Sequence, residues 1–127
     1  MKITRFENLQ ARQQGRVLAN LVYDATDQGG FVKDFTLRDQ IRGAAGSVMH
    51  NCAEGFDSGS DNEFIVFPKY ARRSASEIQS EIYLALDRKH VDQSKFKQIY
   101  DKATETKKII NALIAYLRRS KSDKKTS

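Results

Sequence analysis

The residues that could bind a metal or carry out catalysis are few in this sequence of 127 residues. Glu77 and Glu81 lie one helical turn apart, and Asp87 and His90 have the spacing of the Glu-x-x-His pairs in di-metal helical bundles. Such a centre needs a second pair of this kind, which the sequence lacks. We therefore predict no metal site and no cofactor.

The segment 57–63, with its aspartates, serines and glycine, is similar to a calcium-binding loop. Calcium loops carry glycine at the sixth position and glutamate at the twelfth, whereas here glycine is third and Pro68 is twelfth. The same residues fit a capping box better, with Ser60 at the N-cap and Glu63 three positions later. We expect a helix to begin there and no calcium to bind.

Nothing in the sequence assembles a nucleophile, a base and an oxyanion donor. The single cysteine, Cys52, lies on the apolar face of a helical segment, which favours a buried structural thiol over a nucleophile. His50 and Glu54 are one turn apart and could pair on the surface. Phosphate-loop, dinucleotide and nucleophile-elbow motifs are absent from the sequence, so we predict that the protein is not an enzyme.

Basic groups are the remaining candidates for chemistry. The formal net charge is +6, but residues 118–127 contribute +4 of it, so the rest of the chain is nearly neutral. Clustered Lys and Arg can contact phosphates, although for a single copy of the chain a solvated surface with interspersed acids explains them slightly better. Assembly of several copies would multiply such weak contacts. The candidate phosphate contacts are Arg38, Lys69, Arg72, Arg73, Lys107, Lys108, Arg118, Arg119 and Lys121.

Four segments with helical periodicity must position these residues. The first covers about residues 4–27 and is ended by two glycines, and the second covers 37–54 with Thr36 as its N-cap. The third begins after Ser60, and the fourth begins after Asp92, which is its N-cap. The loop after the first has Phe31, Val32 and Phe35 as apolar anchors. No strand-like alternation appears, so we predict an all-α, antiparallel, up-and-down four-helix bundle. The inner face of the fourth segment follows 3-4 spacing: Phe96, Ile99, Ala103, Thr106, Ile110, Leu113 and Leu117.

Three further features concern packing. Gly43 and Gly46 lie inside the second predicted helix, where glycine is unfavourable, so we expect a neighbouring helix to approach closely there. Pro68, inside the third, predicts a kink or an irregular start. Apolar residues outside the main stripes indicate a second buried surface, most simply from self-association. They are Ile65, Val66, Tyr70, Tyr83, Leu84, Tyr100, Ile109, Ile114 and Tyr116.

Several segments resemble the bacterial four-helix-bundle proteins encoded in intervening sequences of large-subunit ribosomal RNA genes. The resemblance covers residues 5–119, and departures from the family pattern occur at Asp57, Pro68 and the pair Lys89–His90, where a glycine and an aromatic residue are usual. The segments that carry it are Phe6–Leu9, Leu37–Val48, Asn51–Phe56, Glu63–Phe64, Phe67 and Ala71–Glu77.

The resemblance implies a homopentamer that is similar in fold to the accessory variability determinant of diversity-generating retroelements, a basic pentamer that binds nucleic acid and its reverse transcriptase. Arg42, Asn51, Glu54 and Glu77 match the family's recurrent polar positions. We interpret them as a structural polar network at a helix or subunit contact, because polar residues near a bundle seam fix register or satisfy one another.

These observations predict a bundle over residues 1–119 and a basic disordered tail over 120–127. The function we predict is binding of RNA or DNA through basic helix surfaces and the tail, by an oligomer without catalytic activity. The alternative is a protein-interaction scaffold for a partner enzyme such as a reverse transcriptase. Short apolar runs and an N-terminus without a signal-peptide pattern predict a cytoplasmic protein with no membrane partner.

Overall fold

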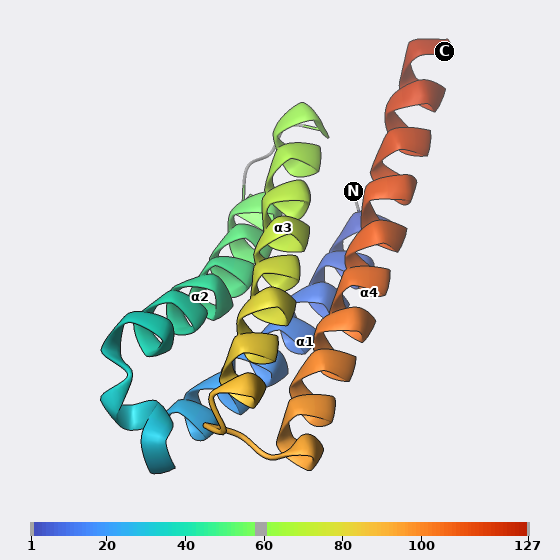
Figure 1. Ribbon diagram of the computed structural model, residues 1–127. Coiled ribbons are helices and arrows are strands. Elements are labelled where there is room, and N and C mark those ends of the chain that lie inside the picture. The colour runs from blue at the N-terminus through green and yellow to red at the C-terminus, as the bar shows by residue number, and fades with distance from the viewer. Residues whose placement is uncertain (1, 58–60, 127) are drawn as a thin grey trace.

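The computed structural model describes the backbone of residues 2–57 and 61–126, and side chains within residues 10–54 and 65–119. Over these residues the chain is all-α and contains no strand, as predicted (Figure 1). Four α-helices and one short 3-10 helix follow one another. They are α1 (Lys2–Thr26), η1 (Gly29–Lys33), α2 (Phe35–Asp57), α3 (Asp61–Asp87) and α4 (Gln93–Thr126).

The four α-helices form a helical bundle in which each packs against two neighbours. The helix α1 contacts α2 and α4, and α3 contacts the same two helices. The N-terminus of α1 and the C-terminus of α4 lie at the same end of the bundle, and α4 extends beyond the other helices there (Figure 1). Helices adjacent in sequence are therefore adjacent in space, as short connections require.

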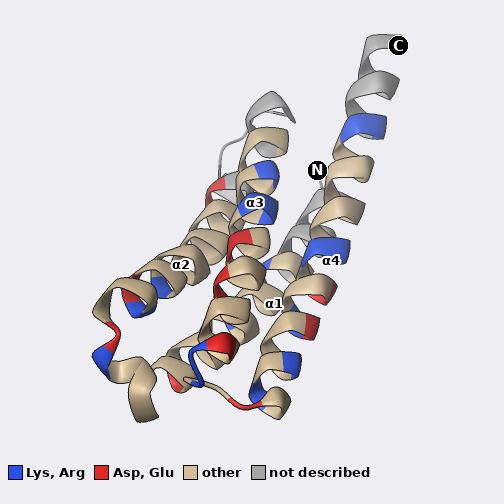
Figure 2. Ribbon diagram, in the orientation of Figure 1, with Lys and Arg blue, Asp and Glu red and all other residues tan. Residues whose placement is uncertain are grey.

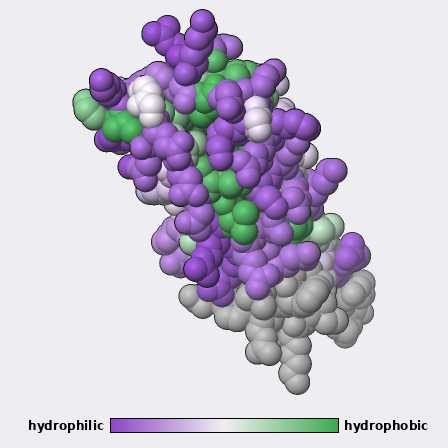
Figure 3. Space-filling model, turned by 90° about the horizontal axis from the view of Figure 1, so that it is seen from below, coloured by the Kyte–Doolittle hydropathy of each residue, from purple (hydrophilic) through white to green (hydrophobic). Residues whose placement is uncertain are grey.

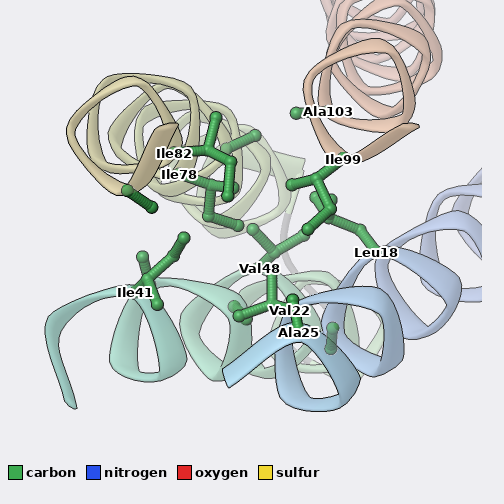
Figure 4. Packing of buried hydrophobic residues seen from close by; sticks show 14 of the residues in the cluster. Leu18, Val22, Ala25, Ile41, Val48, Ile78, Ile82, Ile99 and Ala103 are labelled. Atoms are coloured by element: carbon green, nitrogen blue, oxygen red, sulfur yellow. The ribbon is translucent and has the colours of Figure 1, made fainter. Parts of the chain in front are cut away.

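The core is built from one apolar stripe of each helix. Leu18 of α1, Ile41 of α2, Ile78 of α3 and Ile99 of α4 belong to one buried cluster (Figure 4). A second cluster, towards the other end, includes Cys52. The predicted α4 stripe is confirmed, because Phe96 is partly buried and its other members are buried: Ile99, Ala103, Thr106, Ile110, Leu113 and Leu117.

The start of α2 differs from the sequence prediction. The helix begins at Phe35, and the backbone N–H of Leu37 donates to Asp34 Oδ1 at 3.2 Å, so Asp34 is the cap and the prediction of Thr36 was wrong. Asp34 also lies 2.9 Å from His90 Nε2, which holds it in place. Of the predicted anchors, Phe31 is buried but Phe35 is exposed.

The predicted boundaries of α3 and α4 meet different outcomes. Asp92 caps α4 as predicted, because its Oδ1 accepts from the backbone N–H of Lys95 at 2.8 Å. Ser60 lies outside the described residues. The helix α4 continues to Thr126 and not only to the predicted bundle boundary at 119, since no glycine or proline follows Leu117 to end it. The division into a bundle over residues 1–119 and a basic disordered tail over 120–127 stays a prediction.

The glycines of α2 contradict the expected close approach. An added Cβ at Gly43 or Gly46 would meet no atom within 4 Å. The close approach lies elsewhere, at Gly15 of α1, where an added Cβ would lie 3.0 Å from Cγ1 of Val48. The surface of α2 at Gly43 and Gly46 is therefore open.

The end of α3 explains one departure from the family pattern. Lys89 has φ of 63°, in the left-handed region that favours glycine. The backbone N–H of Lys89 donates to the carbonyl of Leu86, and that of His90 to the carbonyl of Ala85 at 2.8 Å, which is the Schellman pattern. Lys89 thus occupies a position built for glycine. The His90 ring stacks on Phe31 with a centroid distance of 5.3 Å.

Candidate nucleic-acid interface

Two basic side chains join α3 to α4. Arg72 Nη1 donates to Asn111 Oδ1 at 2.8 Å, and Lys107 Nζ donates to Ser76 Oγ at 3.2 Å. The residue number rises along α3 as it falls along α4 in these two pairs. This reversed order places the first half of α3 beside the last half of the bundle portion of α4.

A stretch within each of these halves contains cations and no acids, and Asp61 and Glu63 precede the stretch of α3. Residues 65–76 of α3 and residues 106–119 of α4 include no Asp or Glu, and blue segments without red ones mark them in Figure 2. Because the two stretches lie side by side, their cations gather in one part of the molecule around the α3–α4 contact made by Arg72 and Lys107, and we call this set the basic face. Its members are Lys69, Arg72, Arg73, Lys107, Lys108, Arg118 and Arg119.

The charges of the basic face are not neutralised by nearby carboxylates. Within the side chains described, none of its seven cations forms an ion pair with Asp or Glu. Lys69, Arg73 and Lys108 are exposed, and the Arg73 guanidinium lies 5.9 Å from the centroid of the Tyr70 ring. The surface can therefore attract phosphates. Sequence reasoning found these residues but not their convergence, which depends on how α3 and α4 align.

Two candidate phosphate contacts lie outside the basic face. Arg38, at the start of α2, donates to the carbonyl of Val32 at 3.0 Å and pairs with Asp39 at 3.2 Å. Its guanidinium also lies 4.8 Å from the centroid of the Phe35 ring. Arg38 thus supports the turn before α2. The side chain of Lys121 lies outside the described residues.

Arg42 links α2 to the end of α1. Its Nε donates to Thr26 Oγ1 at 2.7 Å, its Nη2 lies 2.6 Å from Asp27 Oδ1, and its guanidinium lies 4.8 Å from the Tyr23 ring centroid. A cation at a helix C-terminus also interacts favourably with the helix dipole. These contacts support a structural role for Arg42.

The other members of the predicted polar network are not joined to Arg42. Asn51 Nδ2 donates to the carbonyl of Ser47 at 2.9 Å, and Ser47 Oγ accepts from Ser74 Oγ at 2.8 Å. The hydrogen bond between the two serines joins α2 to α3. Glu54 lies 3.9 Å from His50. Among the hydrogen bonds of the described side chains, none connects Arg42, Asn51, Glu54 and Glu77 to one another.

A groove separates α2 from α3 on the side away from the basic face. It has a volume of about 400 Å³, and its charged lining residues are Glu77 and Glu81. Glu81 Oε1 is buried and has no hydrogen-bond partner. Burial, with a smaller contribution from the Glu77 charge, raises the pKa of Glu81 to about 7. The remaining lining residues are Gln40, Gly43, Ala44, Ser47 and Ser74, and we call this surface the acidic groove.

Other candidate chemistry finds little support. Burial raises the pKa of the Cys52 thiol to about 12, as expected of the buried thiol that the sequence predicts. In the part of the chain that the structure describes, no three His, Cys, Asp or Glu side chains gather as metal ligands. The helices described there include none that is long and apolar enough to cross a membrane.

The fold and the basic face define a class, which is that of helical-bundle proteins with a cationic face. A family model describes the 23S rRNA-intervening sequence proteins, and it matches residues 7–112. The chain belongs to this family, which confirms the resemblance found in the sequence.

A solved structure shows the same fold. It is a protein of unknown function from the S23 ribosomal protein family, from Bacteroides thetaiotaomicron, which superposes with a TM-score of 0.78. The two are 19% identical, and the alignment covers 86% of this chain and 98% of the other. No curated protein sequence matches this chain.

Proposed function

We propose that this protein is a non-catalytic nucleic-acid-binding protein that holds RNA or DNA phosphates on the basic face. In this proposal the helices form an antiparallel up-and-down bundle, and the bundles assemble into a homopentameric ring. Each ring repeats the basic face and gathers the basic C-terminal segments, so weak phosphate contacts add together.

One observation carries the proposal: two acid-free helix segments lie side by side and gather seven cations in one part of the molecule. A solvated bundle surface normally mixes charges of both signs, as the rest of α4 does with Lys97 paired to Asp101 and Lys102 to Glu105. Membership of a family named for ribosomal RNA intervening sequences is consistent with a role near nucleic acid.

A second candidate function is a protein-interaction scaffold without direct nucleic-acid contact. Large apolar side chains on the surface favour it, because contiguous exposed apolar area marks interaction sites. Green patches on the face shown in Figure 3 mark apolar residues at the surface. Those at least 37% exposed are Val17, Tyr23, Val32, Phe35, Met49, Val66, Tyr70, Tyr83 and Leu84.

The test is binding of a generic single-stranded RNA to the full chain at 50 and 200 mM salt. If about four phosphates contact each chain, affinity should fall roughly 50-fold between these concentrations. Absence of binding at the lower salt concentration would reject the proposal and leave the scaffold function.

A matched pair of variants locates the contact. Replacing Lys69, Arg73 and Lys108 by Glu should abolish most binding at low salt, since all three are exposed members of the basic face. The control replaces Lys33, Arg88 and Lys97 by Glu, which changes the net charge equally but lies outside the basic face. Equal losses in the two variants would show attraction by net charge alone and contradict a localised site.

A further inference from the structure

The acidic groove belongs to a surface of α3 that its own chain leaves uncovered. Val66, Tyr70 and Leu84 are each between 43% and 49% exposed. They continue the line of Glu77 and Glu81 along α3 at spacings of three and four residues, counting Ser74. A stripe with this spacing is typical of a helix face that packs against another helix. The core uses a different stripe of α3, which includes Ile78 and Ile82.

Two exposed glycines of α2, of which Gly43 lines the acidic groove, favour close approach of another molecule. Interior glycines cost a helix about 1 kcal/mol each relative to alanine. Gly43 and Gly46 nevertheless lie exposed on α2, and none of the side chains that the structure describes fills the space above them. Small residues on a helix surface permit a second helix to approach closely. Nothing within the chain makes use of these two glycines.

A cationic groove lies on the opposite side of α2. It is formed by α1 and α2, has a volume of about 300 Å³, and its charged lining residues are Arg12 and Arg16. Met49 lines it, and Met49 and neighbouring Val17 are 38% and 44% exposed. This surface, which we call the cationic edge, therefore complements the acidic groove in charge and also carries apolar area.

We propose that the acidic groove binds the cationic edge of a second copy of this chain. Arg16 of the second copy lies against Glu77 and Glu81, and Val17 and Met49 cover Leu84 or Tyr70. Each copy has the acidic groove on one side of α2 and the cationic edge on the other. The contact is therefore head-to-tail and repeats from copy to copy. Such contacts close into a ring when the rotation between copies allows it. The inference rests on the ring that the proposed function includes, and it names its interface.

An unpartnered carboxylate supports this assignment. Glu81 Oε1 is buried without a hydrogen-bond partner, but the Glu81 side chain as a whole is only partly buried and lies one turn from exposed Glu77, so a guanidinium in the groove would stabilise the charge of this pair. Glu77 and Glu81 lie in the acidic groove, whereas the basic face contains no glutamate or aspartate. A cation from a neighbouring copy explains why the two glutamates lie together.

Charge reversal tests the pairing by sedimentation velocity on the full chain. We expect R16E, and separately E77R/E81R, to raise the protein concentration needed for assembly by at least about tenfold, because each places like charges together. The triple variant R16E/E77R/E81R reverses both surfaces and should regain assembly. A D87R/D101R variant controls for net charge, since both carboxylates lie outside the acidic groove.

A second variant avoids any effect of charge on folding. G43Q adds a helix-favouring side chain at a lining residue of the acidic groove, where an added Cβ meets no described atom within 4 Å, so the folded monomer should persist. The same side chain blocks approach to α2 and should also raise the concentration for assembly by at least tenfold. G43Q that assembles like the wild type overturns the proposal, as does a wild-type chain that stays monomeric at 100 µM.

The experiment separates this interface from the proposed function. RNA binding is measured on the same variants, and the basic-face variant is measured for assembly. If R16E and G43Q lose assembly while wild-type rings bind no RNA, the interface stands and the nucleic-acid function fails. If RNA binds and the charge-reversed triple variant does not regain assembly, the interface fails and the function stands.

Discussion

The two sides of α3 differ in how far the chain satisfies its own polar groups. On the side that faces α4, Arg72, Ser76 and Gln79 all form hydrogen bonds with α4 side chains. On the side that faces α2, Glu81 has a buried oxygen without a hydrogen-bond partner, beside a groove floored by glycine and serine. One side is complete within a single chain, whereas the other is not.

This difference separates two kinds of interaction surface. The basic face is held rigidly by cross-helix hydrogen bonds and carries excess charge, which suits a flexible, highly charged ligand such as nucleic acid. The acidic groove combines open small residues, half-exposed apolar residues and an unsatisfied carboxylate, which suits a shaped protein surface. The two sides should therefore respond differently to mutation.

The largest effect is expected on the complete side. Gln79 is 8% exposed, and its Nε2 donates to Thr104 Oγ1 at 2.8 Å and to the carbonyl of Tyr100 at 3.2 Å. Q79A removes both hydrogen bonds and leaves a cavity, so we expect a loss of about 2 kcal/mol in the free energy of unfolding. Urea denaturation checks this, with S80A on the exposed surface as control. A loss no larger than that of S80A would contradict the difference between the two sides.

On the side of α3 that faces α2, removing a polar group should raise the free energy of unfolding instead of lowering it, and the gain should depend on pH. The pKa of Glu81 is raised in the folded chain to about 7, so folding is favoured when this group is protonated. Stability due to it is present below pH 4.5 and is lost as pH rises to about 7. E81Q should therefore raise the free energy of unfolding at pH 8 by about 1.5 kcal/mol, allowing for solvent screening of a partly exposed group, and change little at pH 4.

Thermal melting of E81Q and of E105Q at both pH values measures this effect. Glu105 is exposed and pairs with Lys102, so E105Q should change the melting temperature little at either pH. Equal shifts of E81Q at pH 4 and pH 8 would show that its effect does not come from the carboxylate charge.

The fold could be predicted because local patterns determine it. The α4 stripe and the Asp92 cap follow from helical periodicity and from side-chain capping, both of which act over a few residues. The start of α2 was missed because Asp34 is positioned by His90, 56 residues away. The spacing of Thr36 and Asp39 resembles a capping box and favoured Thr36, although aspartate is the better N-cap residue.

The site could be predicted only in part. The clusters Lys69–Arg73 and Lys107–Lys108 are visible in the sequence, but their convergence depends on the alignment of α3 with α4. The acidic groove was missed as a surface, although the spacing of Glu77 and Glu81 was noted. The burial of Glu81 depends on where α2 lies, and no local pattern encodes that position.

A smaller effect is expected where α3 ends, below both surfaces. Lys89 adopts φ of 63°, a conformation that is strained for a residue with a Cβ. K89G should raise the free energy of unfolding by about 1 kcal/mol without affecting either the basic face or the acidic groove. Denaturation of K89G beside R88G, a glycine placed one residue earlier, provides the measurement. A gain in R88G as well would refute the assignment of strain to Lys89.

The smallest effects test whether the space above Gly43 and Gly46 on α2 is empty within a single chain. G43A and G46A should each raise the free energy of unfolding of the monomer by about 0.7 kcal/mol, because alanine favours the helix and meets no neighbour. G15A is the matched control: the added Cβ lies 3.0 Å from Val48 Cγ1, and overpacking should cancel or exceed the gain. Dilute samples keep assembly out of the measurement. If G43A and G46A destabilise the monomer as G15A does, the chain itself already fills the space above these two glycines. The side of α3 that faces α2 would then be as fully packed within one chain as the side that faces α4.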